Sequence, residues 1–402
     1  MIFGILGCLA MVYRFGEYSL DTVKYELKHG DQKVSVEPQV FDVLRFLMEN
    51  RERVVSKDDL IDAVWGGRIV SDATLSSRIS AARSAVGDTG DAQSVIRTIP
   101  KRGFQFVIEL EAENQTQNVP HSSTHRQKVK FCRSLDGTQL AYATTGSGYP
   151  LVRAGHWLTH LEYDWHSPVW RPFLNQFGRH FQVTRYDQRG NGLSDWSVAT
   201  FDLDRFTEDL EAVVEAAGLE KFALYGSSQG APISIAYAVR NPHRVSHLIL
   251  HGGYALGRLV RGSIEDREQG EALLTLIRYG WGKSGSPFLK AFSSMYIPGG
   301  TTEQIESLAE LQRQTTTPEN AVDIRKAIDS FDVTDLLDKI SVPTLVIHAR
   351  NDGVHPLDEG RKLAAGIRNS EFLMLDSNNH VILDHEPAWS ELFDGIQSFV
   401  LE

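Results

Sequence analysis

The stretch Phe222-Ala-Leu-Tyr-Gly-Ser-Ser-Gln-Gly230 decides the fold of the larger part of this chain. Its first four residues form an apolar run that predicts a buried strand, and Ala231 to Arg240 predicts a helix directly after it. The two glycines permit a tight turn between strand and helix, which lifts Ser228 above the sheet. We therefore expect Ser228 to act as a nucleophile, with the backbone amide of Gln229 at the helix start donating to an oxyanion.

Strand-like and helix-like runs alternate on both sides of this stretch. The expected strands cover residues 129–133, 139–143, 151–154, 181–186, 222–225 and 248–251. Residues 206–217 carry an apolar stripe at helical spacing. This alternation predicts an α/β fold. Between about 256 and 340 the strand pattern stops, and short helical runs predict a helical lid inserted over the site.

A serine nucleophile at such a turn needs an acid and then a histidine further along the chain. Asp352 follows an apolar run that begins at Thr344, where its carboxylate can orient an imidazole. His380 lies in the loop after the last expected strand, where its ring can take the serine proton and return it to a leaving group. His355 and Asp376 remain alternatives for these roles. A helix cap at Asp352 and a plain loop position at His380 also stay open.

Residues 128–402 resemble the α/β-hydrolase family, because nucleophile, acid and histidine occur in that family's order. The stretch Tyr186-Asp-Gln-Arg-Gly-Asn-Gly-Leu-Ser194 also resembles the family's loop after the fourth strand. In this loop, Asp187 and Arg189 are expected to be structural rather than catalytic. A serine nucleophile with a histidine base suits acyl transfer, so the expected substrate is an ester, thioester, lactone or amide.

One stretch departs from the family's pattern. Its usual His-Gly after the third strand is replaced by Ala154-Gly-His-Trp157. By position, the resemblance implies that the backbone amide of His156 joins that of Gln229 in the oxyanion hole. Trp157 either shapes the acyl pocket or is simple packing. No metal-binding or nucleotide-binding motif is visible in the sequence, so we expect neither a metal nor a cofactor.

A polar stretch divides the chain. Residues 111–127 contain almost no apolar side chains, which predicts a linker between domains at 11–110 and 128–402. The sequences on its two sides share no internal repeat, so they are expected to fold differently.

The first of these domains shows amphipathic helices between small strands. Val40 to Met48 has apolar residues at helical spacing, and Ser56-Lys-Asp-Asp59 has the form of a capping box before a second helix. A third helix is expected from Asp72 to Val86. Residues 95–108 predict a hairpin with a basic tip, and residues 13–36 predict short strands. This order resembles the winged helix-turn-helix domain of OmpR/PhoB-type transcriptional regulators.

The resemblance implies that the third helix enters the major groove of DNA and that the hairpin touches the adjacent minor groove or backbone. Five basic residues face only two acidic ones between positions 78 and 102, which favours contact with phosphates. Serines on the exposed helix face permit a close approach to base edges. The expected DNA contacts are Ser76, Ser77, Arg78, Ser80, Arg83, Arg97, Lys101 and Arg102. A solvated helix face is the alternative.

The whole-chain composition limits the classes of partner. The 402 residues carry a net charge of -11, so attraction to DNA must come from a local patch. The two cysteines, Cys8 and Cys132, argue against a disulfide framework and fit a reducing cytoplasm. The apolar start from Met1 to Val12 is too short for a membrane span and lacks signal-peptide features. We expect a cytoplasmic protein without stable membrane insertion, in which Met11 is an alternative start.

These patterns predict a transcriptional regulator that binds promoter DNA and whose C-terminal domain binds and hydrolyses a small acylated effector. Paired half-sites favour a homodimer. Two alternatives stay open. In one, the chain is primarily a serine hydrolase, for example of an acyl-homoserine lactone, and the winged helix is an accessory module. In the other, the hydrolase fold is a catalytically silent ligand sensor.

Overall fold

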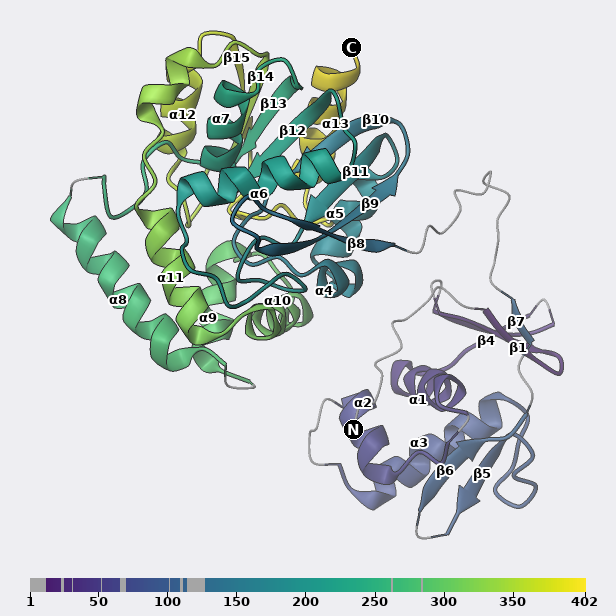
Figure 1. Ribbon diagram of the computed structural model, residues 1–402. Coiled ribbons are helices and arrows are strands. Elements are labelled where there is room, and N and C mark those ends of the chain that lie inside the picture. Colours follow the sequence, from purple (N-terminus) through teal and green to yellow (C-terminus); the bar gives the residue numbers. More distant parts are fainter. Residues whose placement is uncertain are drawn as a thin grey trace. The chain divides into compact units, whose positions relative to one another are not determined.

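The computed structural model describes residues 12–402 with the exception of 23–24, 31, 52, 66–69, 101, 109–110, 114–126, 262 and 283–284. The chain divides into two compact units, Met1–Ser123 and Thr124–Glu402, and each is described by itself (Figure 1). The apolar start considered above lies almost entirely outside the described residues. Within the described residues, no helix is both long enough and apolar enough to cross a membrane.

The N-terminal unit combines a small antiparallel sheet, helices and a hairpin. In the part that the structure describes, its five-stranded sheet has the order β4-β3-β2-β1-β7. The strands are β1 (Val12–Phe15), β2 (Tyr18–Asp21), β3 (Glu26–His29), β4 (Gln32–Val34) and β7 (Glu111–Glu113). The helices are α1 (Pro38–Glu49), α2 (Lys57–Trp65) and α3 (Asp72–Ala85), and the hairpin pairs β5 (Ile96–Ile99) with β6 (Gly103–Phe106). This order confirms the predicted winged-helix fold.

Apolar stripes on the helices form the core of this unit. The stripe residues predicted on α1 and α3 are all 3% exposed or less: Val40, Val43, Leu44, Leu47, Met48, Leu75, Ile79, Ala82 and Val86. Burial of each larger side chain contributes about 1.5–3 kcal/mol. The capping box is also present, because the Ser56 amide donates to the Asp59 carboxylate and the Asp59 amide donates to the Ser56 hydroxyl, both at 3.0 Å. These bonds satisfy backbone amides where α2 begins.

The linker prediction is wrong at both of its ends. Glu111–Glu113 forms β7, whose backbone pairs antiparallel with Val12–Arg14 of β1. Backbone hydrogen bonds define this edge strand, so its polar sequence concealed it. At the other end, the side chain of Gln127 donates to the carbonyl of Leu161 at 3.1 Å, within the C-terminal unit. Residues 114–126 of the predicted linker lie outside the described residues.

The C-terminal unit is built on an eight-stranded sheet with the order β15-β14-β13-β12-β10-β11-β9-β8 among the described residues. Its strands are β8 (Val129–Arg133), β9 (Gln139–Gly146), β10 (Tyr149–Arg153), β11 (Phe181–Tyr186), β12 (Phe222–Ser227), β13 (Val245–His251), β14 (Thr344–Ala349) and β15 (Ser370–Leu375). The strands from β15 to β11 are parallel, and β9 and β8 continue the sheet antiparallel. A largely parallel sheet with helical connections confirms the predicted α/β class.

Helices connect these strands, and further helices are inserted between β13 and β14. The connecting and C-terminal helices are α4 (Leu161–His166), α5 (Trp170–Phe177), α6 (Leu203–Ala216), α7 (Gly230–Arg240), α12 (Leu357–Gly366) and α13 (Ala388–Leu401). The inserted helices are α8 (Ile264–Gly280), α9 (Pro287–Tyr296), α10 (Thr302–Thr315) and α11 (Pro318–Asp329). Figure 1 shows the inserted helices gathered at one end of the sheet. They occupy the stretch in which the sequence predicts a helical lid.

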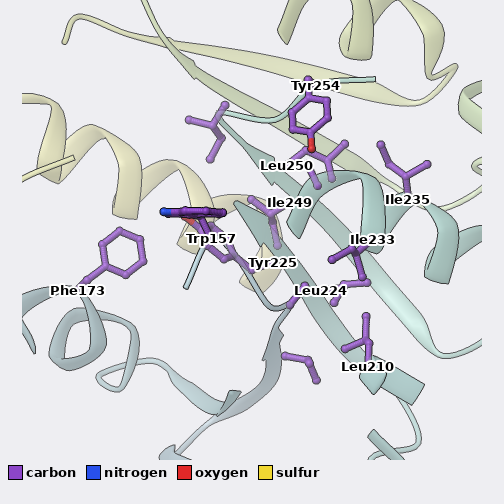
Figure 2. Close-up of a cluster of buried hydrophobic side chains, with 14 of the residues drawn as sticks. Trp157, Phe173, Leu210, Leu224, Tyr225, Ile233, Ile235, Ile249, Leu250 and Tyr254 are labelled. Carbon is purple, nitrogen blue, oxygen red and sulfur yellow. The ribbon is translucent and has the colours of Figure 1, made fainter. Parts of the chain in front are cut away.

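The buried core around β12 holds the strand and helix on either side of the nucleophile turn. Figure 2 shows Leu224 and Tyr225 of β12 near Ile249 and Leu250 of β13, and Ile233 of α7 close by. All five side chains are fully buried. Because protein interiors are close-packed, this packing leaves the turn between β12 and α7 little freedom to move.

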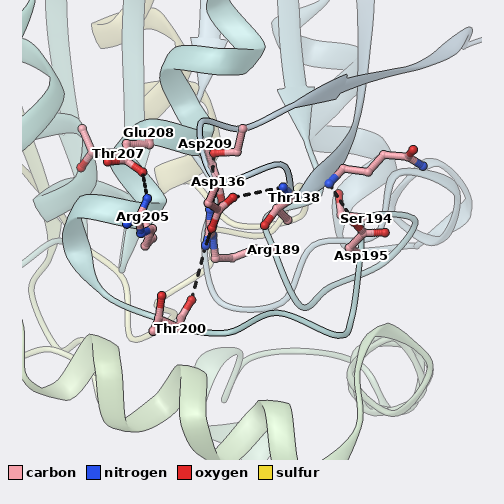
Figure 3. A network of polar contacts seen from close by, with 12 residues as sticks. Asp136, Thr138, Arg189, Ser194, Asp195, Thr200, Arg205, Thr207, Glu208 and Asp209 are labelled. Carbon is pink, nitrogen blue, oxygen red and sulfur yellow. Dashed lines mark hydrogen bonds and ion pairs between the residues drawn. The ribbon is translucent and has the colours of Figure 1, made fainter.

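A buried polar network anchors the loop between β11 and α6 (Figure 3). Arg189 is completely buried and donates to both carboxylate oxygens of Asp209 on α6, at 2.6 and 2.8 Å. It also donates to Asp136, in the turn between β8 and β9, at 2.8 Å, and to the carbonyl of Thr200 at 3.4 Å. Arg189 therefore ties three segments together and has no surface to offer a ligand.

Candidate active site and DNA-binding face

The turn between β12 and α7 holds Ser228 in a left-handed backbone conformation. Its φ is +53°, which is rare for a residue other than glycine and is typical of a strained turn. A Cβ at Gly226 would lie 2.4 Å from the carbonyl oxygen of Gly230, so the backbone passes too closely for any side chain there. The Ser228 amide donates to the carbonyl of His251 at 2.9 Å and ties the turn to β13. The backbone thus fixes the point at which the Ser228 side chain leaves the turn.

Asp352 and His380 meet beside this turn. Asp352 lies in the loop after β14 and His380 in the loop after β15, and the carboxylate Oδ2 is 2.7 Å from the imidazole Nδ1. The other carboxylate oxygen accepts hydrogen bonds from the amides of Val354 (2.8 Å) and His355 (3.0 Å). Burial alone would raise the pKa of Asp352, but His380 and these hydrogen bonds outweigh it and lower the pKa. The ionised carboxylate is therefore suited to orient the ring and to stabilise its protonated form.

His380 and Ser228 face the same cavity. The absence of a side chain at Gly252 makes room for the ring, because a Cβ there would lie 3.0 Å from the His380 Cε1 atom. A further imidazole lies at this point, since His355 Nε2 is 3.5 Å from Ser228 Oγ. The ring centroids of His355 and His380 are 5.5 Å apart. The structure thus brings together the serine, the acid, the expected base and one of the residues considered as an alternative base.

The segments of the expected oxyanion hole are joined by side-chain amides. Gln229 donates to the side-chain oxygen of Gln188 at 2.8 Å, and Gln188 in turn donates to the carbonyl of His156 at 3.2 Å. Among the residues that the structure describes, none accepts a hydrogen bond from the backbone amide of His156 or Gln229. Both amides are therefore unused within the described chain. Gln188 was not among the predicted site residues, although it lies inside the Asp-Gln-Arg stretch that resembles the family's loop.

The ring of His156 is neutral, and both of its nitrogens are used in hydrogen bonds within the protein. A guanidinium can only donate, so His156 Nε2 accepts from Arg153, 2.6 Å away, and Nδ1 carries the proton, which it donates to the Trp157 carbonyl at 3.1 Å. Burial, and then the charge of Arg153, lower the pKa of His156 well below its usual value. Only the backbone of His156 is left as a donor to a substrate.

A cavity with a largely aromatic lining adjoins Ser228. Its apolar lining includes Trp157, Trp170, Phe173, Tyr296, Leu308 and Leu311. Tyr296 belongs to α9 and the two leucines to α10, so inserted helices supply part of the wall. The Trp157 ring donates to Gln312 Oε1 on α10 at 3.1 Å, which links the loop after β10 to the insertion. A lining of this kind suits an apolar group.

The predicted DNA contacts fall into two groups in the N-terminal unit. Exposed side chains include Ser76, Ser77 and Ser80 on α3 and Arg97 and Arg102 on the hairpin. Lys101 lies outside the described residues. Among the described residues, neither Arg97 nor Arg102 is paired with an acidic side chain.

Two of the predicted contacts are corrected by the structure. Arg83 is 8% exposed, and its guanidinium donates to the carbonyl of Ile96 and, at 2.9 Å, to the hydroxyl of Thr98. Its side chain therefore fastens α3 to β5 instead of pointing to solvent. Arg78 is half-buried and is paired with the carboxylate of Glu37, so its charge is already compensated. The side chains of both arginines are long enough to contact neighbouring parts of the N-terminal unit from the edge of the exposed face of α3.

Comparison with known proteins assigns both units. The family model described as "alpha/beta hydrolase fold" matches residues 158–387, which is more than half of the chain. The model described as "Transcriptional regulatory protein, C terminal" matches residues 31–106. A relative that supports this N-terminal match is the transcriptional activator CadC of Escherichia coli. It is 31% identical over 100 residues, which cover 25% of this chain and 20% of CadC.

The C-terminal unit has relatives among the esterases. The pimeloyl-[acyl-carrier protein] methyl ester esterase of Nitrosomonas europaea is 27% identical over 218 residues, covering 53% of this chain and 81% of the esterase. The solved esterase of Exiguobacterium antarcticum has a TM-score of 0.59 at 22% identity, over 68% of this chain and 100% of that chain, and it shows the fold alone. This chain belongs to the alpha/beta hydrolase fold family and carries a transcriptional-regulator DNA-binding module ahead of its hydrolase unit.

Proposed function

We propose that this protein is a DNA-binding regulator whose hydrolase unit cleaves a small acylated effector with Ser228, His380 and Asp352. The observation that carries the proposal is the 2.7 Å contact between Asp352 and His380 beside a serine with a φ of +53°. A strained serine, a carboxylate-held histidine and a shared cavity are the parts that nucleophilic acyl transfer requires.

In the proposed reaction, Ser228 Oγ attacks the acyl carbon while His380 Nε2 takes the hydroxyl proton. The carbonyl oxygen, on which negative charge develops, accepts hydrogen bonds from the backbone amides of His156 and Gln229. His380 then gives the proton to the leaving alcohol or amine, and an acyl-enzyme remains. A water molecule then attacks the acyl carbon while His380 takes its proton. The bond from the acyl carbon to Ser228 Oγ breaks, His380 returns the proton to Oγ, and the acid is released. Asp352 stabilises the protonated ring in both halves.

The aromatic cavity supports a small apolar acyl group as the part of the effector that is bound. A relative named as a methyl ester esterase supports an ester bond, and lactones and amides are cleaved by the same sequence of steps. On the DNA side, the proposal rests on the exposed side chains of Ser76, Ser77, Ser80, Arg97 and Arg102. We propose domain boundaries near residues 11–113 and 127–402.

The test is turnover of p-nitrophenyl esters with acyl chains of two to eight carbons. Ser228→Ala is expected to lose activity by at least 10³-fold, because removal of a triad member leaves only binding and oxyanion contributions. Ser390→Ala is the matched control, since Ser390 is exposed on α13. Mass spectrometry after brief mixing with ester should find an acyl adduct on the peptide that contains Ser228. Unchanged turnover in Ser228→Ala overturns the proposal.

A further inference from the structure

The imidazole of His355 is held against the nucleophile by contacts that the proposed reaction does not use. Its Nε2 lies 3.5 Å from Ser228 Oγ, and its ring packs on Tyr254 with centroids 4.5 Å apart. The ring is only 6% exposed. Its backbone amide donates to the same Asp352 carboxylate that holds His380, so one carboxylate positions both imidazoles.

The proton on His355 can be located from its other nitrogen. His355 Nδ1 lies 3.4 Å from Arg261 Nη2, and a guanidinium has no acceptor, so Nδ1 must be the accepting nitrogen. A neutral ring then carries its proton on Nε2, the nitrogen that faces Ser228. Burial, and then the neighbouring His380 and arginine side chains, lower the pKa of His355 well below its usual value. The ring is therefore neutral and is a donor toward the serine.

Arg261 is itself fixed in place. Its guanidinium donates to the carbonyl of Leu256 at 3.0 Å and lies 3.7 Å from the carboxylate of Glu359, which is 3% exposed. The arginine precedes α8, so the contact to His355 joins the start of the helical insertion to the nucleophile. A charged group held from two sides keeps the tautomer of the ring constant.

We propose, on the basis of the function proposed above, that His355 donates a hydrogen bond from Nε2 to Ser228 Oγ and leaves the serine's own proton to His380. A hydroxyl has one proton and two lone pairs, so an N–H pointing at Oγ excludes the serine proton from that side. His355 cannot then accept the proton, and the base is His380. The same N–H stabilises Oγ while negative charge develops on it, both in attack and when Oγ leaves the acyl-enzyme.

The test replaces His355 without removing its packing. His355→Phe keeps a ring on Tyr254 but has no donor, whereas His355→Gln places an amide N–H near the position of Nε2. His355→Leu is a second variant without a donor, in case the phenylalanine does not fold. The measurements are kcat and KM for p-nitrophenyl butyrate, the rate of inactivation by diisopropyl fluorophosphate, and the thermal unfolding midpoint.

We expect the variants without a donor to lose about 10- to 100-fold in kcat and in inactivation rate, with KM changed by less than twofold. His355→Gln should recover most of both rates. Equal losses in the Gln and Phe variants indicate a packing role and overturn the inference. Wild-type rates in His355→Phe overturn it as well, and so does a loss as complete as that of Ser228→Ala while His380→Ala stays active.

The outcomes separate this inference from the proposed function. Retained turnover in Ser228→Ala removes the proposed reaction and the inference with it. An inactive Ser228→Ala together with a fully reactive His355→Phe removes only the inference.

Discussion

Replacing Arg189 by methionine removes the cation from a completely buried ion pair. Arg189 and its partner Asp209 are both 0% exposed, and the guanidinium donates to both carboxylate oxygens. The substitution leaves Asp209 without its main compensating charge in the interior. Breaking such a pair by removing one partner costs about 3–5 kcal/mol. We therefore expect Arg189→Met to lower the free energy of unfolding of the hydrolase unit by that amount.

The double variant Arg189→Met, Asp209→Leu removes both buried charges and is expected to recover most of this loss, because apolar replacement of a buried pair is often close to neutral. Arg179→Met is the control, since Arg179 is exposed and surface substitutions change stability by about 0.5 kcal/mol or less.

The assay is urea unfolding followed by tryptophan fluorescence. Six of the seven tryptophans follow residue 124, so the signal reports mainly on the hydrolase unit. A loss below about 1 kcal/mol in Arg189→Met refutes the reasoning, since it means that Asp209 is not left uncompensated. A double variant no more stable than the single one refutes it too.

Three further predictions concern the two units. Asp88→Asn should lower the free energy of unfolding of the N-terminal unit by about 2 kcal/mol at pH 7. Burial raises the pKa of Asp88, but hydrogen bonds from backbone amides outweigh it and bring the pKa to about 2. Since the pKa is lower in the folded state, acid-unfolding curves should show this stability in full above about pH 4 and its loss toward pH 2. Arg102→Ala should weaken promoter binding and reduce the slope of log K against log salt concentration by about 0.9. Arg83→Ala should instead lower the unfolding temperature of the N-terminal unit and leave that slope unchanged. Equal slopes for both variants would contradict the proposed DNA contacts. Asp352→Asn should reduce kcat for p-nitrophenyl butyrate by about 10⁴-fold with little change in KM, because the ring of the base loses its orientation; a loss below tenfold would point to another acid.

Features set by neighbours in the chain were predictable from the sequence. The glycines around Ser228 encode the strained turn locally, and the helical spacing of apolar residues on α1 and α3 encodes their buried faces. The order of strand, turn and helix then led to the α/β sheet that the structure confirms. Such signals need only the few residues that make the turn or one face of a helix.

Features that depend on distant segments were not predictable. Arg83 was expected to be exposed because its helix position borders the polar face, yet its length lets it reach the carbonyl of Ile96. The pairing of β7 with β1 joins the two ends of the N-terminal unit through backbone atoms, which leave no trace in side-chain pattern. His355 was considered only as a rival base, because its place beside Ser228 depends on how β12 and β14 are arranged in the sheet.

The division of the cavity wall between sheet loops and inserted helices has a consequence for how this protein can diverge. Asp352, His380 and Ser228 stand on loops of the sheet, whereas Tyr296 and Leu308 come from the insertion between β13 and β14. Under the proposed function, substitutions in α9 and α10 reshape the space for the acyl group while the proposed reacting groups keep their positions. Regulators of the proposed kind could thereby exchange one effector for another and keep the proposed reaction.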